Sequence, residues 1–225
     1  MLTLGLDTAT GWGCLGLVRD GEVVAETVWE VGRNQAEQFV PALRETMERA
    51  GLAPGALDLI AVGCGPGSYT GIRIGLAMAE ALSFTLERPV TGVGTLAALA
   101  GNGSGFPAPV CAAILARRGE VYAAVYHGSR ELLPPAPWVP ALLHRQLAEL
   151  GLTEVLVLGN GSELLRATAP PDGPALVRGR PEQDVVRGAV VARLGAERPH
   201  EPAVPLYLRR TEAEERRPFR VGVGG

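Results

Sequence analysis

The stretch GCGPGSYTGIRIG, residues 63–75, decides how the middle of this chain folds. It follows the apolar run at residues 57–62 and leads into a long apolar segment that ends near Leu86. Glycine permits backbone angles that other residues resist, proline fixes one torsion, and the hydroxyl groups of Ser68 and Thr70 can cap a helix. The stretch therefore predicts a buried strand, a tight turn and a helix, in that order.

The glycine turn has two interpretations. Such a turn can aim several backbone N–H groups at one point and hold an anion at the amino end of the helix. Its spacing matches neither the phosphate loop, which needs a lysine before Ser or Thr, nor the dinucleotide fingerprint. The alternative is a structural turn that lets the helix pack closely on its strand, and local features favour this second interpretation.

The helix expected over residues 71–86 has very little polar surface. Its only charged residues are Arg73 and Glu80, which lie seven positions apart and so on nearly the same side. Four small residues on it would let a second helix come close: Gly75, Ala77, Ala79 and Ala81. A helix with so narrow a polar stripe must be covered on most sides, either by its own domain or by another chain.

Composition excludes several classes of protein. The 225 residues are 47% hydrophobic and 20% charged, which is ordinary for a soluble globular protein. No apolar run is long enough to span a membrane and the amino terminus lacks a secretory pattern, so we expect a cytoplasmic protein with no membrane contact. All 21 basic residues are arginine, against 24 acidic residues. Without lysine the chain has no Schiff-base, phosphate-loop or kinase lysine.

The cysteines and histidines do not form a recognisable metal or disulfide pattern. The three cysteines lie far apart without CxxC spacing, which argues against a zinc site or a disulfide framework. The three histidines fall on different expected elements, so no metal site is predicted. Ser68 has no histidine near it in sequence and does not lie in a nucleophile elbow, so no catalytic residue is predicted either.

The chain is expected to contain two α/β lobes. A first hairpin at residues 2–28 is echoed by a second at residues 110–126, which suggests a duplicated unit. The linker GNGSGFP at residues 101–107 is the clearest boundary. We therefore expect three parts: a first lobe at 1–101, a second, reduced lobe at 106–210, and a flexible tail at 211–225.

Three motifs resemble the TsaB family, also called YeaZ. They are the glycine stretch, the opening LGLDTAT at residues 4–10 and RGEVY at residues 118–122, with scattered matches later in the chain. Members of that family assist in placing threonylcarbamoyl on the adenosine next to the anticodon of certain tRNAs. The resemblance implies an α/β fold of two RNase H-like lobes in the actin-like, sugar-kinase and heat-shock ATPase architecture, with the second lobe reduced.

In that architecture a nucleotide lies between the lobes, with acidic residues from both first hairpins handling metal and phosphates. Asp7, Thr8 and Thr10 are the cofactor-binding candidates, although Asp7 could instead only cap its own turn. The second hairpin has Leu115 where TsaB-like sequences commonly have an aspartate, and Leu115 cannot bind a metal. No cofactor is therefore required, and any ATP or ADP binding is expected to be weak or vestigial.

The resemblance implies a non-catalytic scaffold that binds TsaD, with TsaE nearby, and that contacts tRNA only through this complex. It also implies a homodimer through the same surface when TsaD is absent. The alternatives are a stand-alone actin-like nucleotide phosphotransferase and a metallopeptidase, against which the lack of paired histidines argues. The partner-binding candidates are Gly65, Pro66, Gly67, Ser68, Tyr69, Thr70, Gly71, Arg73, Gly75, Met78, Ala79 and Leu82, and Ala79→Arg is expected to abolish TsaD binding without harming the fold.

Overall fold

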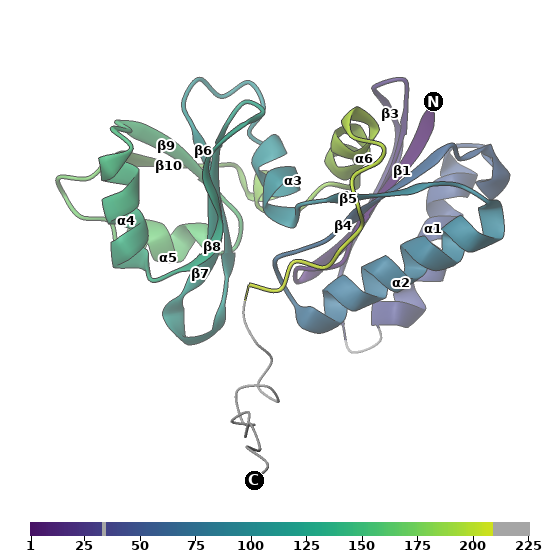
Figure 1. The fold of residues 1–225 in the computed structure, drawn as a ribbon, viewed down its shortest axis with the longest axis horizontal. Helices are drawn as coiled ribbons and strands as arrows, with labels where there is room; N and C mark the ends of the chain where they lie inside the picture. Colours follow the sequence, from purple (N-terminus) through teal and green to yellow (C-terminus); the bar gives the residue numbers. More distant parts are fainter. Residues whose placement is uncertain (33–34, 209–225) are drawn as a thin grey trace, which may run out of the picture.

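The computed structural model describes residues 1–32 and 35–208, and it has two lobes that each contain a five-stranded sheet (Figure 1). The strand orders are β3-β2-β1-β4-β5 and β10-β9-β6-β7-β8. In both sheets an antiparallel hairpin precedes parallel strands, so the expected two-lobe α/β architecture is confirmed. The tail expected at 211–225 lies outside the described residues.

The first sheet begins with the predicted hairpin and continues through the strand that precedes the glycine turn. Its members are β1 (Leu2–Asp7), β2 (Trp12–Arg19), β3 (Glu22–Glu30), β4 (Leu59–Gly63) and β5 (Val90–Val93). Every residue of β1 and β4 is buried, because helices cover both faces of the sheet at these central strands.

Two helices cover one face of the first sheet and a third covers the other (Figure 1). The first two are α1 (Gln35–Arg49), which continues through Pro41, and α2 (Tyr69–Leu86). The opposite face is covered by α6 (Gly188–Glu197), whose buried side chains include Val191 and Ala192.

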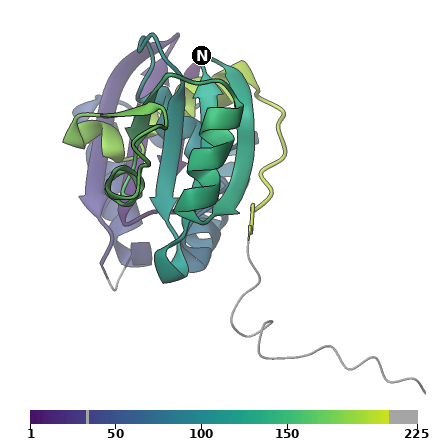
Figure 2. The ribbon, with the colours of Figure 1, turned by 90° about the vertical axis from the view of Figure 1, so that its left-hand side faces the viewer.

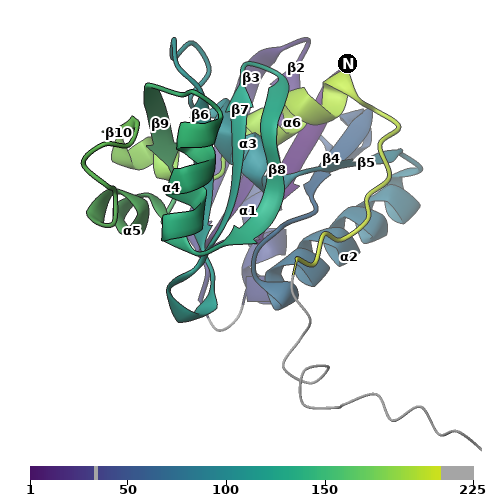
Figure 3. The same cartoon turned by 60° about the vertical axis from the view of Figure 1, so that its left-hand side comes forward.

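The second lobe holds β6 (Val110–Leu115), β7 (Val121–His127), β8 (Arg130–Trp138), β9 (Glu154–Leu158) and β10 (Ala175–Arg178). Its outer face carries α4 (Pro140–Glu149) and α5 (Ser162–Ala167), as Figures 2 and 3 show. The proline-rich sequence at residues 134–140 predicts an extended segment, and residues 134–138 of it lie in the edge strand β8, where missing N–H donors are tolerated.

The two lobes share a core formed by helices that lie between the sheets. The helix α3 (Thr95–Gly101) packs on β6 and β7, and it also contacts α6. Leu96 and Leu99 of α3 lie in one buried cluster with residues from both sheets. Figure 1 shows α3 and α6 side by side at this junction.

The chain returns to the first lobe before it ends, which differs from the expected assignment of 106–210 to the second lobe. The backbone of α6 lies directly on β1 and β2. The approach is so close that a Cβ atom added at Gly5, Gly16 or Gly188 would collide with backbone atoms of the opposing element. These three glycines permit a close approach that larger residues would prevent. The helix α6 therefore packs on the first sheet and is part of the first lobe.

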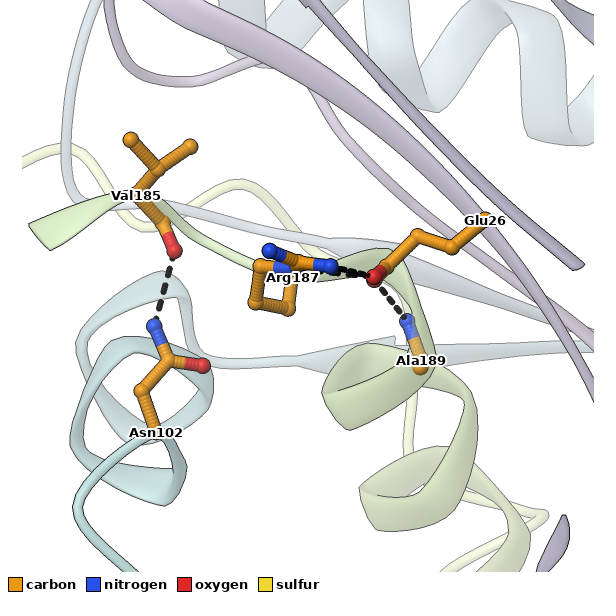
Figure 4. Close-up of polar contacts among 5 residues, drawn as sticks. All are labelled: Glu26, Asn102, Val185, Arg187 and Ala189. Carbon is orange, nitrogen blue, oxygen red and sulfur yellow. Dashed lines mark hydrogen bonds and ion pairs between the residues drawn. The ribbon is translucent and has the colours of Figure 1, made fainter. Parts of the chain in front are cut away.

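The segment at residues 185–189, which leads from the second lobe into α6, makes polar contacts with α3 and with β3 (Figure 4). The amide Nδ2 of Asn102, at the end of α3, donates to the carbonyl of Val185 at 2.7 Å. On the other side Glu26 of β3 accepts from Arg187 Nε at 2.8 Å and from the backbone N–H of Ala189 at 3.0 Å. The sequence pattern predicts one helix over roughly residues 181–194, whereas the chain forms a 3₁₀ turn at Pro181–Asp184, an extended segment and then α6.

Candidate functional site

The glycine turn between β4 and α2 packs against the loop that follows β1. A Cβ atom at Gly67 would collide with the carbonyl of Ala9, and one at Gly71 would collide with the carbonyl of Thr8. The turn thus needs glycine at both positions to let the two backbones touch. Ser68 caps α2 as predicted, because its Oγ accepts from the N–H of Gly71 at 3.2 Å.

Backbone donors of the turn are used inside the chain. The N–H of Gly65 donates to Thr95 Oγ1 at 3.0 Å, and the N–H of Ser68 donates to the carbonyl of Ala9 at 2.7 Å. The capping bond occupies the N–H of Gly71. These contacts favour the structural interpretation of the turn over an anion-binding one.

Asp7 is completely buried, and both of its carboxylate oxygens have partners. Its Oδ1 accepts from the N–H of Ala9 at 2.7 Å and its Oδ2 accepts from Thr95 Oγ1 at 2.6 Å. Burial raises the pKa of Asp7 from 3.8 to about 6, and the two hydrogen bonds oppose that rise. The arrangement matches the turn-capping alternative.

The other cofactor candidates are also engaged within the chain. Thr8 is buried and its Oγ1 donates to the carbonyl of Gly71 at 2.7 Å. Thr10 is half-buried and its Oγ1 donates to the carbonyl of Trp12 at 3.0 Å. At the end of β6 Leu115 is exposed and offers no ligand. Within residues 1–32 and 35–208, no group of three or more His, Cys, Asp or Glu side chains could hold a metal ion.

The helix α2 has one face in the core and one face on the surface. Its buried residues are Gly71, Ile72, Gly75, Leu76 and Ala79. Its exposed residues after the first turn are Arg73, Ala77, Glu80, Ala81, Phe84 and Thr85. Phe84 is 89% exposed, which is unusual for a large apolar side chain. We call the exposed set, with Tyr69 and Thr70, the outer face of α2.

The partner-binding candidates divide between the two faces. Ser68, Tyr69, Thr70 and Arg73 are exposed, and Gly67, Met78 and Leu82 are half-buried. The remaining five candidates are buried: Gly65, Pro66, Gly71, Gly75 and Ala79. The expectation that Gly75 and Ala79 lie open to a second helix is wrong, because both pack α2 onto its own sheet. A Cβ at Gly75 would lie 2.7 Å from Thr8 Oγ1, and Ala79 has no exposed surface.

An aromatic cluster marks the amino end of the outer face. The ring of Tyr69 lies 4.9 Å from that of Tyr207, measured between centroids, and the Arg73 guanidinium lies 5.4 Å from the Tyr69 centroid. Arg73 Nη1 also donates to the Tyr69 hydroxyl at 2.9 Å. Sequence analysis named Ala81 as a small residue that would let a second helix come close, but it missed Phe84 and Tyr207. Helical spacing from Arg73 could have identified Phe84, whereas nothing local identifies Tyr207.

Comparison with known proteins gives consistent matches along the whole chain. A tRNA threonylcarbamoyladenosine biosynthesis protein TsaB from Bacillus subtilis is 32% identical over 227 residues, covering 95% of this chain and 96% of the relative. The chain belongs to the TsaB family. Residues 26–136 also match the family model of TsaD, tRNA N6-adenosine threonylcarbamoyltransferase.

Solved structures agree with TsaB membership. YeaZ from Pseudomonas aeruginosa has a TM-score of 0.74 at 28% identity, and the match covers 92% of this chain and 99% of that one. A ROK hexokinase from Thermus thermophilus has a TM-score of 0.53 at 15% identity, covering 87% of this chain and 100% of that chain, which shows the sugar-kinase fold alone. The predicted resemblance is confirmed, and the family is that of a biosynthesis protein for tRNA threonylcarbamoyladenosine.

The described part of the chain, residues 1–32 and 35–208, contains no helix with the length and apolar character needed to cross a membrane.

Proposed function

We propose that this chain is a non-catalytic subunit of the threonylcarbamoyladenosine pathway that docks on a TsaD protein through the outer face of α2. The observation that carries the proposal is Phe84, 89% exposed at one end of a helix whose outer face also presents Ala77 and Ala81. Exposed apolar surface of this kind is typical of protein interfaces, and small residues let a second helix approach closely.

The match of residues 26–136 to the TsaD family model supports the choice of partner. That range contains the second half of β3 and the whole of α1, β4 and α2, the elements that form and support the outer face. Two chains with the same local pattern can present equivalent helices to each other around an approximate two-fold axis. The same geometry allows two copies of this chain to pair when TsaD is absent, so both dimers would compete for one surface. We place TsaE, the ATPase partner, at the same junction.

Among residues 1–32 and 35–208, the candidate positions form no open acidic site, which supports a non-catalytic role. Asp7 is buried with both carboxylate oxygens engaged, and Leu115 stands where a second carboxylate would be needed. A metal that bridges phosphates requires carboxylates from opposite walls of a cleft. A stand-alone phosphotransferase would hydrolyse ATP as a pure chain and lose that activity in Asp7→Ala.

The test is calorimetric titration of TsaD from the same organism with the Ala81→Arg variant. A bulky charge in the middle of the outer face should weaken binding by about 100-fold or more, an effect typical of a central interface position. The matched control is Leu142→Arg on α4, since Leu142 is 55% exposed on the outer side of the second lobe. The control should bind like the unaltered chain. Unchanged affinity in Ala81→Arg would refute docking through α2.

A further inference from the structure

The residues that follow α6 form an ordered strap along the first lobe. We define the strap as residues 201–207, shown in yellow in Figures 1 and 3. At its start the carbonyl of Glu201 accepts from the N–H of Gly92, in β5, at 2.9 Å. Near its end the N–H of Leu206 donates to the carbonyl of Cys64, directly after β4, at 2.7 Å. The strap therefore runs from β5 to the glycine turn that precedes α2.

The surface beneath the strap fits its backbone closely. A Cβ atom at Gly92 would lie 2.5 Å from the carbonyl oxygen of Pro202, and one at Gly65 would lie 3.0 Å from the carbonyl oxygen of Leu206. Larger residues at these two positions would push the strap away from the lobe. The two glycines therefore let the strap lie directly on the first lobe.

The first side chains of the strap contribute little to its attachment. Ala203 packs against the core of the first lobe, but Val204 is 64% exposed and Leu206 is 36% exposed. Segments with few buried apolar contacts are among the least stable parts of a fold, and they open without unfolding the rest. The contact at the end of the strap therefore matters for keeping it closed.

That contact joins the strap to the first turn of α2. The ring of Tyr207 lies beside that of Tyr69, and the two ring planes are tilted by 35°. On its other side Tyr69 contacts Arg73, through a hydrogen bond to its hydroxyl and through the guanidinium near its ring. The Tyr69 ring has less freedom when both neighbours contact it. The arrangement of Arg73 on the outer face of α2 is therefore linked to the strap.

We propose that the strap opens and closes as a unit, and that Tyr207 is a positioning residue which, in the closed strap, orders Tyr69 and Arg73 for contact with the protein that docks on α2. This inference rests on the proposed docking role of α2. Binding costs less free energy when the contacting side chains are already ordered. Tyrosine and arginine are also among the residue types most enriched at interface hot spots. Opening of the strap should therefore lower the affinity for that protein.

Cys64 offers a direct measure of whether the strap is open. A Cβ atom at Gly92 would lie 2.9 Å from Cys64 Sγ as well as 2.5 Å from the strap carbonyl of Pro202, so thiol and strap meet at one place. Cys64 is 7% exposed, and burial raises the pKa of its thiol to about 11, so it should react slowly while the strap is closed. Cys14 and Cys111 are completely buried, and their modification would report unfolding of the whole chain instead.

The first test is the rate at which iodoacetamide modifies Cys64 in the full chain, followed by mass spectrometry of its peptides. Tyr207→Ala should raise this rate by about tenfold, the size expected from the loss of an aromatic pair. Tyr207→Phe keeps the ring and should react like the unaltered chain, as should Leu142→Ala on α4. Cys14 and Cys111 should stay unmodified throughout. Equal rates for Tyr207→Ala and the unaltered chain would overturn the proposal.

The second test is calorimetric titration of TsaD with the same variants. Tyr207→Ala should weaken binding by about fivefold, and Tyr207→Phe should restore it. If Tyr207 acts through Tyr69, Tyr207→Ala should cause little further loss in a chain that already carries Tyr69→Ala, because the two residues form one contact. Losses that simply add would mean that Tyr207 does not act by positioning Tyr69.

The outcomes separate this inference from the proposed function. If Ala81→Arg abolishes TsaD binding but Tyr207→Ala leaves it unchanged, the positioning role of Tyr207 is wrong and docking through α2 stands. If Ala81→Arg leaves TsaD binding unchanged, the proposed function fails and the positioning role fails with it. Faster modification of Cys64 together with weaker TsaD binding, both reversed in Tyr207→Phe, is the result that supports the inference.

Discussion

At the scale of single residues, the buried carboxylate of Asp7 is the least expected feature of the chain. Burying a charged side chain costs free energy, even when hydrogen bonds from Ala9 and Thr95 satisfy both carboxylate oxygens. The raised pKa of about 6 expresses that cost. The hydrogen bonds of this carboxylate fix the loop after β1, and the glycine turn packs against that loop. The buried charge therefore helps to position the amino end of α2.

The raised pKa predicts a defined pH dependence of stability. Because the folded value of about 6 lies above the ordinary 3.8, the folded state binds the Asp7 proton more tightly than the unfolded state. This contribution to stability is complete below about pH 4 and is lost as the pH rises to 6. A difference of roughly two pKa units corresponds to about 3 kcal/mol.

Asp7→Asn should remove that dependence, since the amide keeps the acceptor for Ala9 and carries no charge. We expect the variant to unfold at higher urea concentration than the unaltered chain at pH 7.5, and we expect this difference to be clearly smaller at pH 4.5. Urea titrations at both pH values measure the difference. A stability difference that is the same at both pH values would contradict the assignment of this shift to Asp7.

At the scale of elements, α2 combines a core helix and a surface helix in one segment. Its buried face carries Ile72, Leu76 and Ala79, and its outer face carries Ala81 and Phe84. The sequence leaves open whether α2 is covered by its own domain or by a partner. The first possibility applies to the buried face of α2, and we propose the second for its outer face. Single substitutions on the two faces should therefore have different effects.

Ala79→Arg should destabilise the fold, because it would bury an unpaired charge where the side chain has no exposed surface. We expect Ala79→Arg to lower the free energy of unfolding by about 4 kcal/mol or more. Ala81 is exposed, so Ala81→Arg should change the free energy of unfolding by less than about 0.5 kcal/mol. Thermal unfolding followed by circular dichroism compares the two variants. Equal melting temperatures would mean that the faces of α2 are assigned incorrectly.

At the scale of the whole molecule, the two lobes are not independent units. The helix α6 follows the second lobe in sequence but covers the first sheet, and residues 201–207 continue along that lobe to the glycine turn before α2. Glu26 and Asn102 make hydrogen bonds to the segment that enters α6. The same segment of chain thus ends with Tyr207 beside Tyr69, at the amino end of α2.

A chain of residues 1–107 should for this reason fail to fold cooperatively, although it contains all five strands of the first sheet. Without α6, one face of β1, β2 and β4 would be open to water. We expect no cooperative transition in urea and poorly dispersed amide resonances. The matched control is a chain of residues 1–208, which keeps α6 and residues 201–207 and should unfold in one transition. A cooperative fragment would show that the first lobe needs neither.

The sequence by itself determined the elements whose signals are local. Glycine and proline fixed the turn before α2, Ser68 marked its cap, alternating apolar runs gave both hairpins, and the family motifs gave the two-lobe architecture. The short strand β10 and the break before α6 were missed, because both depend on contacts with distant segments. The strand β10 pairs in parallel with β9, and the carbonyl of Val185, before α6, accepts a hydrogen bond from Asn102.

Only the tertiary structure decided which side of α2 is covered, where residues 201–207 lie and what Tyr207 touches. The reason is that helical periodicity identifies a narrow polar stripe but does not tell which apolar residues meet the sheet. That choice depends on how closely two backbones approach, and Gly71 sets the approach of α2 to the backbone of Thr8, 63 positions earlier in the sequence. Contacts at such separation leave no pattern within any single window of the chain.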